Sequence, residues 1–305
     1  MELSVVIPTY NQATLLIHCL EALTQQTLPS GEYEVVVVDD GSTDDTPAIL
    51  ARFQDGPMRL RSIRINANRG RSAARNAGIR DARGTIIVFL DSDVIVDPGF
   101  LAAHLEAHRG HGLRTLTRGP VVHVTSPERA SRTRPPRVAA SPAFLDAANA
   151  GVARTTLLEA GLFDEAFPGY GWEDFDLGQR LKRLGVRRVF CPEAVAWHVQ
   201  PLPQPGDLNA LLRKERERAR SGAYFLRKNP TLETRWLVQW TALHRAVYWA
   251  MAVGGWLRPE RALGLASRMQ QSGKEALGHL ILRAALNQHY LELLKQELRG
   301  DVVLA

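Results

Sequence analysis

The first 100 residues of this chain alternate between short apolar runs and segments with helical spacing. In chain order these are 3–8, 14–25, 33–38, 43–53, 60–65, 70–81 and 85–90. Strands that are apolar along their whole length are buried on both faces, as in a mostly parallel sheet covered by helices. We therefore expect an α/β fold with a Rossmann-like, mostly parallel central sheet flanked by helices.

Polar segments follow three of these predicted strands. They are Pro8-Thr9-Tyr10-Asn11, Asp39-Asp40-Gly41-Ser42 and Asp91-Ser92-Asp93. In open α/β sheets ligands bind beyond the carboxyl ends of the strands, so the three segments should meet at one edge. Acids gathered there repel one another unless a cation meets them. Asp91 and Asp93 therefore predict a site for a divalent cation that also bridges substrate phosphates.

The composition is that of a globular protein, with 45% hydrophobic and 23% charged residues. The two cysteines, Cys19 and Cys191, form no Cys-x-x-Cys pair. We therefore expect neither a disulfide framework nor a structural zinc site, and a reduced, cytoplasmic compartment fits best. The N-terminus enters an apolar run without a basic leader, so we expect no secretory signal.

The net charge of +6 is concentrated in the C-terminal third of the chain. Residues 201–305 hold 16 Lys and Arg against 9 Asp and Glu, whereas the first 200 residues hold 22 against 23. Two interpretations stay open: a solvated helical surface, or peripheral contact with an anionic membrane or acceptor. Nucleic acid is not an expected partner, because no recognised binding motif accompanies the charge.

The C-terminal third also has helical spacing. Residues 208–227 predict a basic helix and residues 277–298 an amphipathic one. Residues 236–257 are apolar and rich in tryptophan, but Arg245 near their centre disfavours a membrane span. This segment predicts one helix, either in a core or lying in a membrane interface.

Five segments, in order, resemble those of the family 2 glycosyltransferases. They are SVVIPTYN (4–11), VVDDGSTD (37–44), NRGRSAARNAG (68–78), FLDSD (89–93) and GYGWED (169–174). The resemblance implies a GT-A fold, a nucleotide-sugar donor and a Mn²⁺ or Mg²⁺ cofactor. It further implies a donor-binding half over 1–115 and an acceptor and catalytic half over 116–205, while the spacing beyond them predicts a helical C-terminal region over 206–305. A Ser-, Pro- and Arg-rich stretch at 124–143 predicts a loop, either a lid or a plain surface insertion.

The resemblance assigns donor contacts to residues at the strand ends. Tyr10 is expected near the nucleobase, Asp40 is expected to accept from a uracil N3–H, and Asp91 is expected to meet the ribose. Capping of the helix after Gly41 is an alternative role for Asp39 and Asp40. The remaining predicted donor contacts are Pro8, Ser92, Arg71 and Arg75.

Arg71 and Arg75 are four residues apart on one face of a predicted helix. Guanidinium groups suit bidentate contacts with phosphate, and the start of a helix attracts anions. An ion pair with the neighbouring acids is the alternative for both arginines.

Metal and catalytic roles follow from the same resemblance. Asp93 and His198 are expected to hold the cation, which offsets charge on the departing diphosphate. Asp174 is expected to act as the base that takes the proton of an acceptor hydroxyl, and Glu173 to hold acceptor hydroxyls. Trp172 is expected to stack on an acceptor sugar. Helix capping is the alternative role for Asp174.

Together these features predict an inverting, metal-dependent glycosyltransferase. It would move a UDP-linked hexose or N-acetylhexosamine to a saccharide, lipid-linked saccharide or protein acceptor in polysaccharide or glycoconjugate synthesis. A sugar nucleotidyltransferase is one alternative, but Pro8-Thr9-Tyr10-Asn11 stands where such enzymes carry a Gly-rich, basic loop. A non-catalytic nucleotide-sugar-binding protein is the other alternative.

Overall fold

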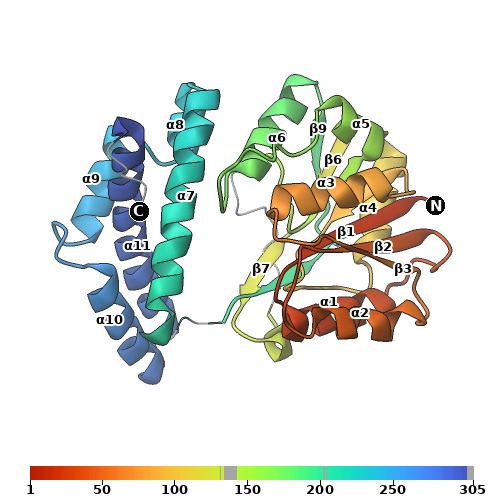
Figure 1. Cartoon of the computed structure of the whole chain (residues 1–305), viewed down its shortest axis with the longest axis horizontal. Coiled ribbons are helices and arrows are strands. Elements are labelled where there is room, and N and C mark those ends of the chain that lie inside the picture. Colours follow the sequence, from red (N-terminus) through yellow and green to blue (C-terminus); the bar gives the residue numbers. More distant parts are fainter. Residues whose placement is uncertain (131, 134–142, 202, 204, 301–305) are drawn as a thin grey trace. The chain divides into compact units, whose positions relative to one another are not determined.

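The computed structural model describes residues 1–130, 132–133, 143–201, 203 and 205–300. The chain divides into two compact units (Figure 1). The α/β unit comprises Met1–Glu165 and Glu173–Pro201, and the helical unit comprises Ala166–Trp172 and Leu202–Ala305. The finer division of the α/β unit into donor and acceptor halves stays a prediction.

A seven-stranded sheet forms the centre of the α/β unit, in the order β3-β2-β1-β4-β8-β6-β9. All neighbouring strands are parallel except β8, which is antiparallel to both β4 and β6. The predicted mostly parallel sheet is therefore confirmed. The strands are β1 (Leu3–Thr9), β2 (Tyr33–Asp39), β3 (Leu60–Arg64), β4 (Ile86–Phe89), β6 (Thr115–Arg118), β8 (Ala150–Ala153) and β9 (Arg187–Phe190).

Helices cover both faces of this sheet, which explains why its strands are apolar without alternation. In β1, Val5 and Ile7 pack into one core layer and Val6 into the opposite layer. The first layer is completed by α1 (Ala13–Thr24), α2 (Thr46–Gln54) and α4 (Phe100–His111). The opposite layer is completed by α3 (Arg71–Asp81), α5 (Arg154–Glu159) and α6 (Glu173–Arg183).

The carboxyl ends of β1, β2 and β4 lie side by side, as the parallel topology predicts. Thr9 is paired with Asp39, and the Asp40 N–H donates to the Thr9 carbonyl at 2.9 Å. The Leu90 N–H, just beyond β4, donates to the Val6 carbonyl at 3.3 Å. The three polar segments therefore begin at one edge of the sheet.

A second, three-stranded sheet lies in the order β5-β10-β7. It comprises β5 (Val94–Val96), β7 (Val121–Val124) and β10 (Ala196–Val199). Antiparallel pairing of β10 with β5 sets His198 opposite Val94, and the Val199 N–H donates to the Asp93 carbonyl at 2.9 Å. Of the predicted loop at 124–143, residues 131 and 134–142 lie outside the described residues.

The helical unit contains α7 (Leu208–Lys228), α8 (Leu232–Leu237), α9 (Ala242–Met251), α10 (Pro259–Gln271) and α11 (Glu275–Arg299). The helices predicted over 208–227 and 277–298 are confirmed. The prediction of one helix over 236–257 is wrong. The backbone turns at Gln239, where φ is +62°, and Thr241 starts a new helix by accepting from the His244 N–H.

The core interpretation of this tryptophan-rich segment is also wrong over α9, since none of the residues of α9 is buried. Among the described residues, no helix is long and apolar enough to cross a membrane.

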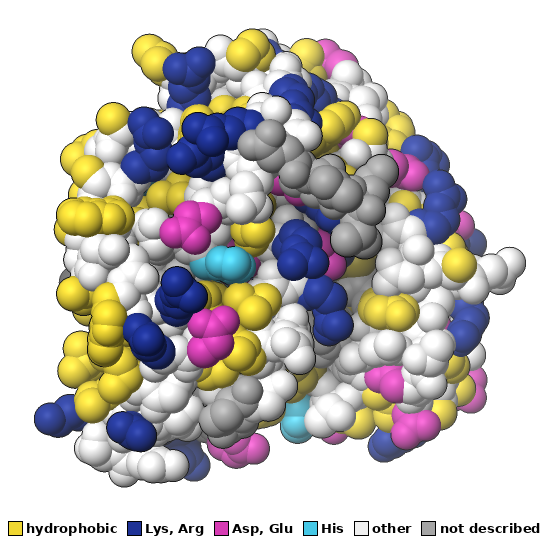
Figure 2. All heavy atoms as spheres, turned by 60° about the vertical axis from the view of Figure 1, so that its left-hand side comes forward, with side chains coloured by type: hydrophobic (Ala, Val, Ile, Leu, Met, Phe, Trp, Pro, Cys, Tyr) yellow, Lys and Arg dark blue, Asp and Glu magenta, His cyan; other side chains and the backbone are white. Residues whose placement is uncertain are grey.

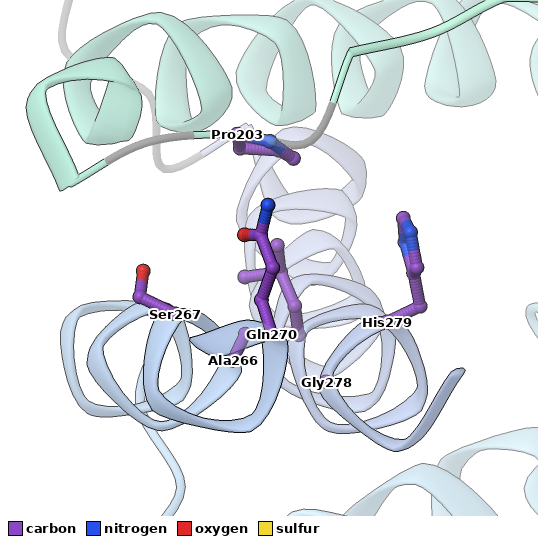
Figure 3. Close-up of a pocket in the computed structure, with 7 residues that line it drawn as sticks. Pro203, Ala266, Ser267, Gln270, Gly278 and His279 are labelled. Carbon is purple, nitrogen blue, oxygen red and sulfur yellow. The ribbon is translucent and has the colours of Figure 1, made fainter. Parts of the chain in front are cut away.

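Figure 3 shows a small pocket beside α10 and α11. Its polar side chains are Ser267, Gln270 and His279. No acid lines this pocket, so it does not provide the carboxylates that the predicted chemistry needs.

Candidate active site

Arg75 joins Asp91 to a pair of acids that lies about eighty residues further along the chain. Its side chain is 2% exposed. Nη2 donates to Asp91 Oδ1 at 2.8 Å, while Nη1 donates to Glu173 Oε1 at 3.3 Å and to Asp174 Oδ1 at 3.4 Å. A buried charge is stable only when it is paired, and the three carboxylates meet this need. Of the two roles left open for Arg75, the structure shows the ion pair.

The pKa values of the acids on the two sides of Arg75 are shifted in opposite directions. Burial raises the pKa of Asp174 to about 7, and the carboxylates of Glu173 and Asp146 act in the same direction against the opposing effect of Arg75. At Asp91 burial would also raise the pKa, but Arg75, Arg71 and His198 outweigh it and hold the pKa below its usual range. The site therefore pairs a permanent anion with a carboxyl group that can exchange a proton near neutral pH.

Asp174 lies in the first turn of α6 and is held from two directions. Arg75 binds Oδ1, and the Ala147 N–H donates to Oδ2 at 3.1 Å. The side chain is still 22% exposed, whereas Glu173 is 7% exposed. Glu173 Oε2 is buried and lacks a hydrogen-bond partner among the described residues. Both carboxyl groups can thus accept a further hydrogen bond.

Asp93 and His198 form the second polar pair of the site. His198 Nε2 lies 3.1 Å from Asp93 Oδ2, because β10 runs back beside β5. Burial would lower the pKa of His198, but the hydrogen bond to Asp93 and the charges of Asp93, Asp91 and Asp146 outweigh it and raise the pKa.

This pair suits a hard divalent cation. Asp93 Oδ1 is buried without a hydrogen-bond partner in the described part of the chain, and a carboxylate oxygen with an imidazole nitrogen is a reasonable Mn²⁺ donor set. Within the same described residues, no group of three or more His, Cys, Asp and Glu side chains could hold a metal alone. Substrate phosphates and water would then supply the other donors, as is usual for Mg²⁺-type sites.

Asp40 lies just beyond the end of β2, where its carboxylate contacts the backbone before α3. Its side-chain oxygens accept from the Arg69 N–H at 2.9 Å and from the Gly70 N–H at 2.8 Å, and the residue is 3% exposed. Burial raises its pKa. The predicted alternative, capping of the helix after Gly41, is wrong, because α2 begins only after Asp45. Asp40 instead ties the end of β2 to the start of α3.

The other predicted donor residues differ in how accessible they are. Pro8 is buried within β1, and Ser92 is 7% exposed. Tyr10 is 43% exposed, and Arg71 is exposed at the first residue of α3. The side chains of Tyr10 and Arg71 are therefore accessible from solvent.

Trp172 belongs to the helical unit. Its indole N–H donates to the Arg218 carbonyl at 3.0 Å, its ring stacks against Phe225, and the residue is 7% exposed. These contacts fix the segment 166–172 on α7. Stacking of Trp172 on an acceptor sugar stays a prediction.

Sequence reasoning missed Asp146. Its Oδ2 accepts from Arg118 Nη2 at 3.2 Å, and its charge raises the pKa values of both Asp174 and His198. The only sequence signal is its place a few residues before the apolar run that forms β8. Asn149 fixes this stretch by donating from Nδ2 to the carbonyls of Pro120 and Ala194.

Several known proteins are similar to this chain in sequence. Residues 4–139 match the family described as Glycosyl transferase family 2. Validoxylamine A glucosyltransferase from Streptomyces hygroscopicus subsp. jinggangensis is 28% identical over 286 residues, covering 81% of this chain and 65% of that protein. The glycosyltransferase AglE of Haloferax volcanii is 44% identical over 90 residues, 30% of each chain. The chain thus spans less than two thirds of the length of these curated relatives.

Solved structures share the fold. The mannosyltransferase PcManGT from Pyrobaculum calidifontis, in complex with GDP-Man and Mn²⁺, superposes with a TM-score of 0.64 at 22% identity, covering 98% of this chain and 87% of that one. S. aureus TarS 1-349 in complex with UDP-GlcNAc gives a TM-score of 0.56 at 19% identity, covering 98% and 92%. Residues 4–139 therefore match the glycosyltransferase family 2 model, and the chain shares the GT-A fold of these solved structures.

Proposed function

We propose that this chain is an inverting, metal-dependent glycosyltransferase that moves a sugar from a nucleotide sugar to an acceptor hydroxyl. One observation carries the proposal: Arg75 binds Asp91 on one side and the Glu173–Asp174 pair on the other. A donor-binding strand tip and a carboxyl group able to act as a base therefore lie around one guanidinium group. The family 2 domain supports the same class of reaction.

Asp174 is the proposed general base. Its raised pKa, about 7, makes the carboxylate a better proton acceptor than an ordinary aspartate, and leaves about half of it ionised at neutral pH and most of it at higher pH. As it takes the hydroxyl proton, the acceptor oxygen forms a bond to sugar C1. The bond from C1 to the diphosphate oxygen breaks on the opposite face, so the configuration at C1 inverts. Glu173 would orient the acceptor through its unpartnered Oε2.

Asp93 and His198 are the proposed protein ligands of Mn²⁺ or Mg²⁺. When bound, the cation supplies positive charge against the negative charge that develops on the departing diphosphate. The buried, unpartnered Oδ1 of Asp93 supports this assignment.

The donor nucleotide is proposed to lie along the edge formed by the strand ends. Asp91 would accept from the ribose hydroxyls and Asp40 from a uracil N3–H, with Tyr10 beside the base. Arg71 would meet the diphosphate from the start of α3. Arg75 is too deeply buried for a similar contact and would position Asp91 and Asp174 instead. Pro8 and Ser92 would line the same site.

UDP-linked hexoses and N-acetylhexosamines are the donors we propose. Named relatives include a glucosyltransferase and the S. aureus TarS protein, described as a poly(ribitol-phosphate) beta-N-acetylglucosaminyltransferase. The acceptor would be a saccharide, a lipid-linked saccharide or a protein, in polysaccharide or glycoconjugate synthesis.

A donor screen tests this function directly. The purified chain is incubated with a panel of UDP- and GDP-sugars, with Mn²⁺ or with EDTA, and release of the nucleoside diphosphate is measured. We expect slow, Mn²⁺-dependent hydrolysis of one UDP-sugar. Donor binding without release would favour a binding protein, and pyrophosphate release from UTP and a sugar phosphate would favour a nucleotidyltransferase.

A further inference from the structure

Part of the helical unit exposes large apolar side chains. Six of those between residues 236 and 256 are 43% to 63% exposed: Trp236, Leu243, Val247, Trp249, Val253 and Trp256. We call these six side chains the tryptophan patch. Proteins rarely leave a large contiguous apolar surface in water unless it serves an interaction. The patch is therefore a candidate contact surface.

The six side chains belong to neighbouring elements. The Trp236 ring of α8 lies 4.7 Å from the His244 ring of α9. A Cβ atom on Gly254 would lie 3.4 Å from the Trp249 ring, so the turn after α9 folds back against that tryptophan. In Figure 2 hydrophobic side chains gather along the left edge of the surface, with Lys and Arg side chains among them. The patch thus extends over α8, α9 and the turn that follows.

Positive charge accompanies the patch. The Arg245 guanidinium lies 5.2 Å from the Trp240 ring, and that of Arg261 lies 5.1 Å from the Trp256 ring. Between residues 232 and 261 four exposed arginines face two exposed glutamates: Arg235, Arg245, Arg258 and Arg261 against Glu233 and Glu260. Tryptophan at the level of lipid headgroups, with arginine beside it, is the mixture that favours an anionic membrane interface.

A second copy of this chain fits the patch less well. Contact between two identical patches would bring both sets of arginines together with too few acids to pair them, and an interface needs complementary charge. Anionic lipid provides apolar chains and negative headgroups at once. We propose that the tryptophan patch binds the surface of an anionic lipid bilayer, with α9 lying in the interface.

Vesicle flotation of the full chain tests this proposal without reference to transfer activity. The probes are phosphatidylcholine vesicles with and without phosphatidylglycerol. We expect binding to the anionic vesicles that weakens as salt rises, and little binding to pure phosphatidylcholine. The double variant Trp249→Ser, Trp256→Ser should bind at least about tenfold more weakly, since it removes two interfacial aromatics. A matched control removes apolar side chains elsewhere: Leu113→Ser with Leu158→Ser, 47% and 43% exposed in the α/β unit, should bind as the parent does.

A second variant, Arg245→Gln with Arg261→Gln, should lose most of the salt-sensitive part of the binding. Circular dichroism confirms that each variant is folded. The proposal is overturned if the parent chain does not float with anionic vesicles, or if both patch variants bind as tightly as the control. It is also overturned if light scattering shows a dimer that the tryptophan variant dissociates while vesicles bind none of the proteins.

Discussion

Replacing Arg75 by methionine should destabilise the α/β unit more than any exposed arginine change on the same helix. The substitution keeps much of the apolar stem but removes the guanidinium partner of Asp174 and the 2.8 Å hydrogen bond to Asp91. Removing one side of a buried ion pair costs about 3–5 kcal/mol, because the remaining charges stay buried. For a unit of this size that corresponds to a fall in melting temperature of about 6–20 °C.

The dependence of this effect on pH follows from the carboxyl groups. In the parent the pKa of Asp91 is lowered, so its contribution to stability is present at neutral pH and is lost only as the pH falls below its unfolded value, about 3.9. The pKa of Asp174 is raised to about 7, so its carboxylate already reduces stability as the pH rises towards 7. Arg75 lowers the pKa of both Asp91 and Asp174, so both pKa values rise when it is removed. The deficit of the variant should therefore be largest at pH 8 and smaller at pH 5.5.

Thermal unfolding followed by circular dichroism at both pH values measures the effect. Arg80→Met is the matched control on α3, since Arg80 is 58% exposed and pairs with Glu165 at 3.6 Å; its loss should cost at most about 1 kcal/mol. The melting temperature of Arg75→Lys should lie between those of the two methionine variants. A lysine ammonium group keeps the charge but lacks the two guanidinium nitrogens that reach acids on both sides. Equal melting temperatures for Arg75→Met and Arg80→Met at pH 8 would refute the role given to Arg75.

Three further results are expected. Asp93→Asn, or EDTA, should reduce UDP release at least about a hundredfold, as loss of a cation at the leaving group implies, and activity that survives EDTA would exclude the metal assignment. The value of kcat/KM should fall about tenfold per pH unit below about pH 7, because protonated Asp174 cannot act as a base; a flat profile down to pH 5 would contradict this. Asp146→Asn should shift that acidic limb to lower pH, since it removes a charge that raises the pKa of Asp174, and an unshifted limb would exclude this influence.

The strand ends were predictable from the sequence, because parallel topology alone brings Thr9, Asp40 and Leu90 to one edge. The ion pairs of Arg75 were left open, since helical spacing shows only which way this side chain faces. Its partners Glu173 and Asp174 are about a hundred residues further along the chain. The family resemblance, and not local spacing, pointed to those two acids.

Other features depend on contacts that no local pattern reveals. Asp146 belongs to no recognisable motif, and only the fold of its loop brings its charge near Asp174 and His198. The tryptophan-rich segment was predicted as one helix from its apolar residues. It is broken by the left-handed backbone at Gln239 and by the cap at Thr241, which depend on local backbone geometry and hydrogen bonding.

The central claim is that Asp174 removes the proton of the acceptor hydroxyl. The most direct measurement compares Asp174→Asn with the parent for both donor affinity and transfer, using calorimetric titration of the donor and single-turnover kinetics. The account predicts donor affinity within about threefold of the parent and transfer reduced by about 10²–10⁴-fold, the usual contribution of a positioned base. Transfer by Asp174→Asn at the parental rate would contradict the account.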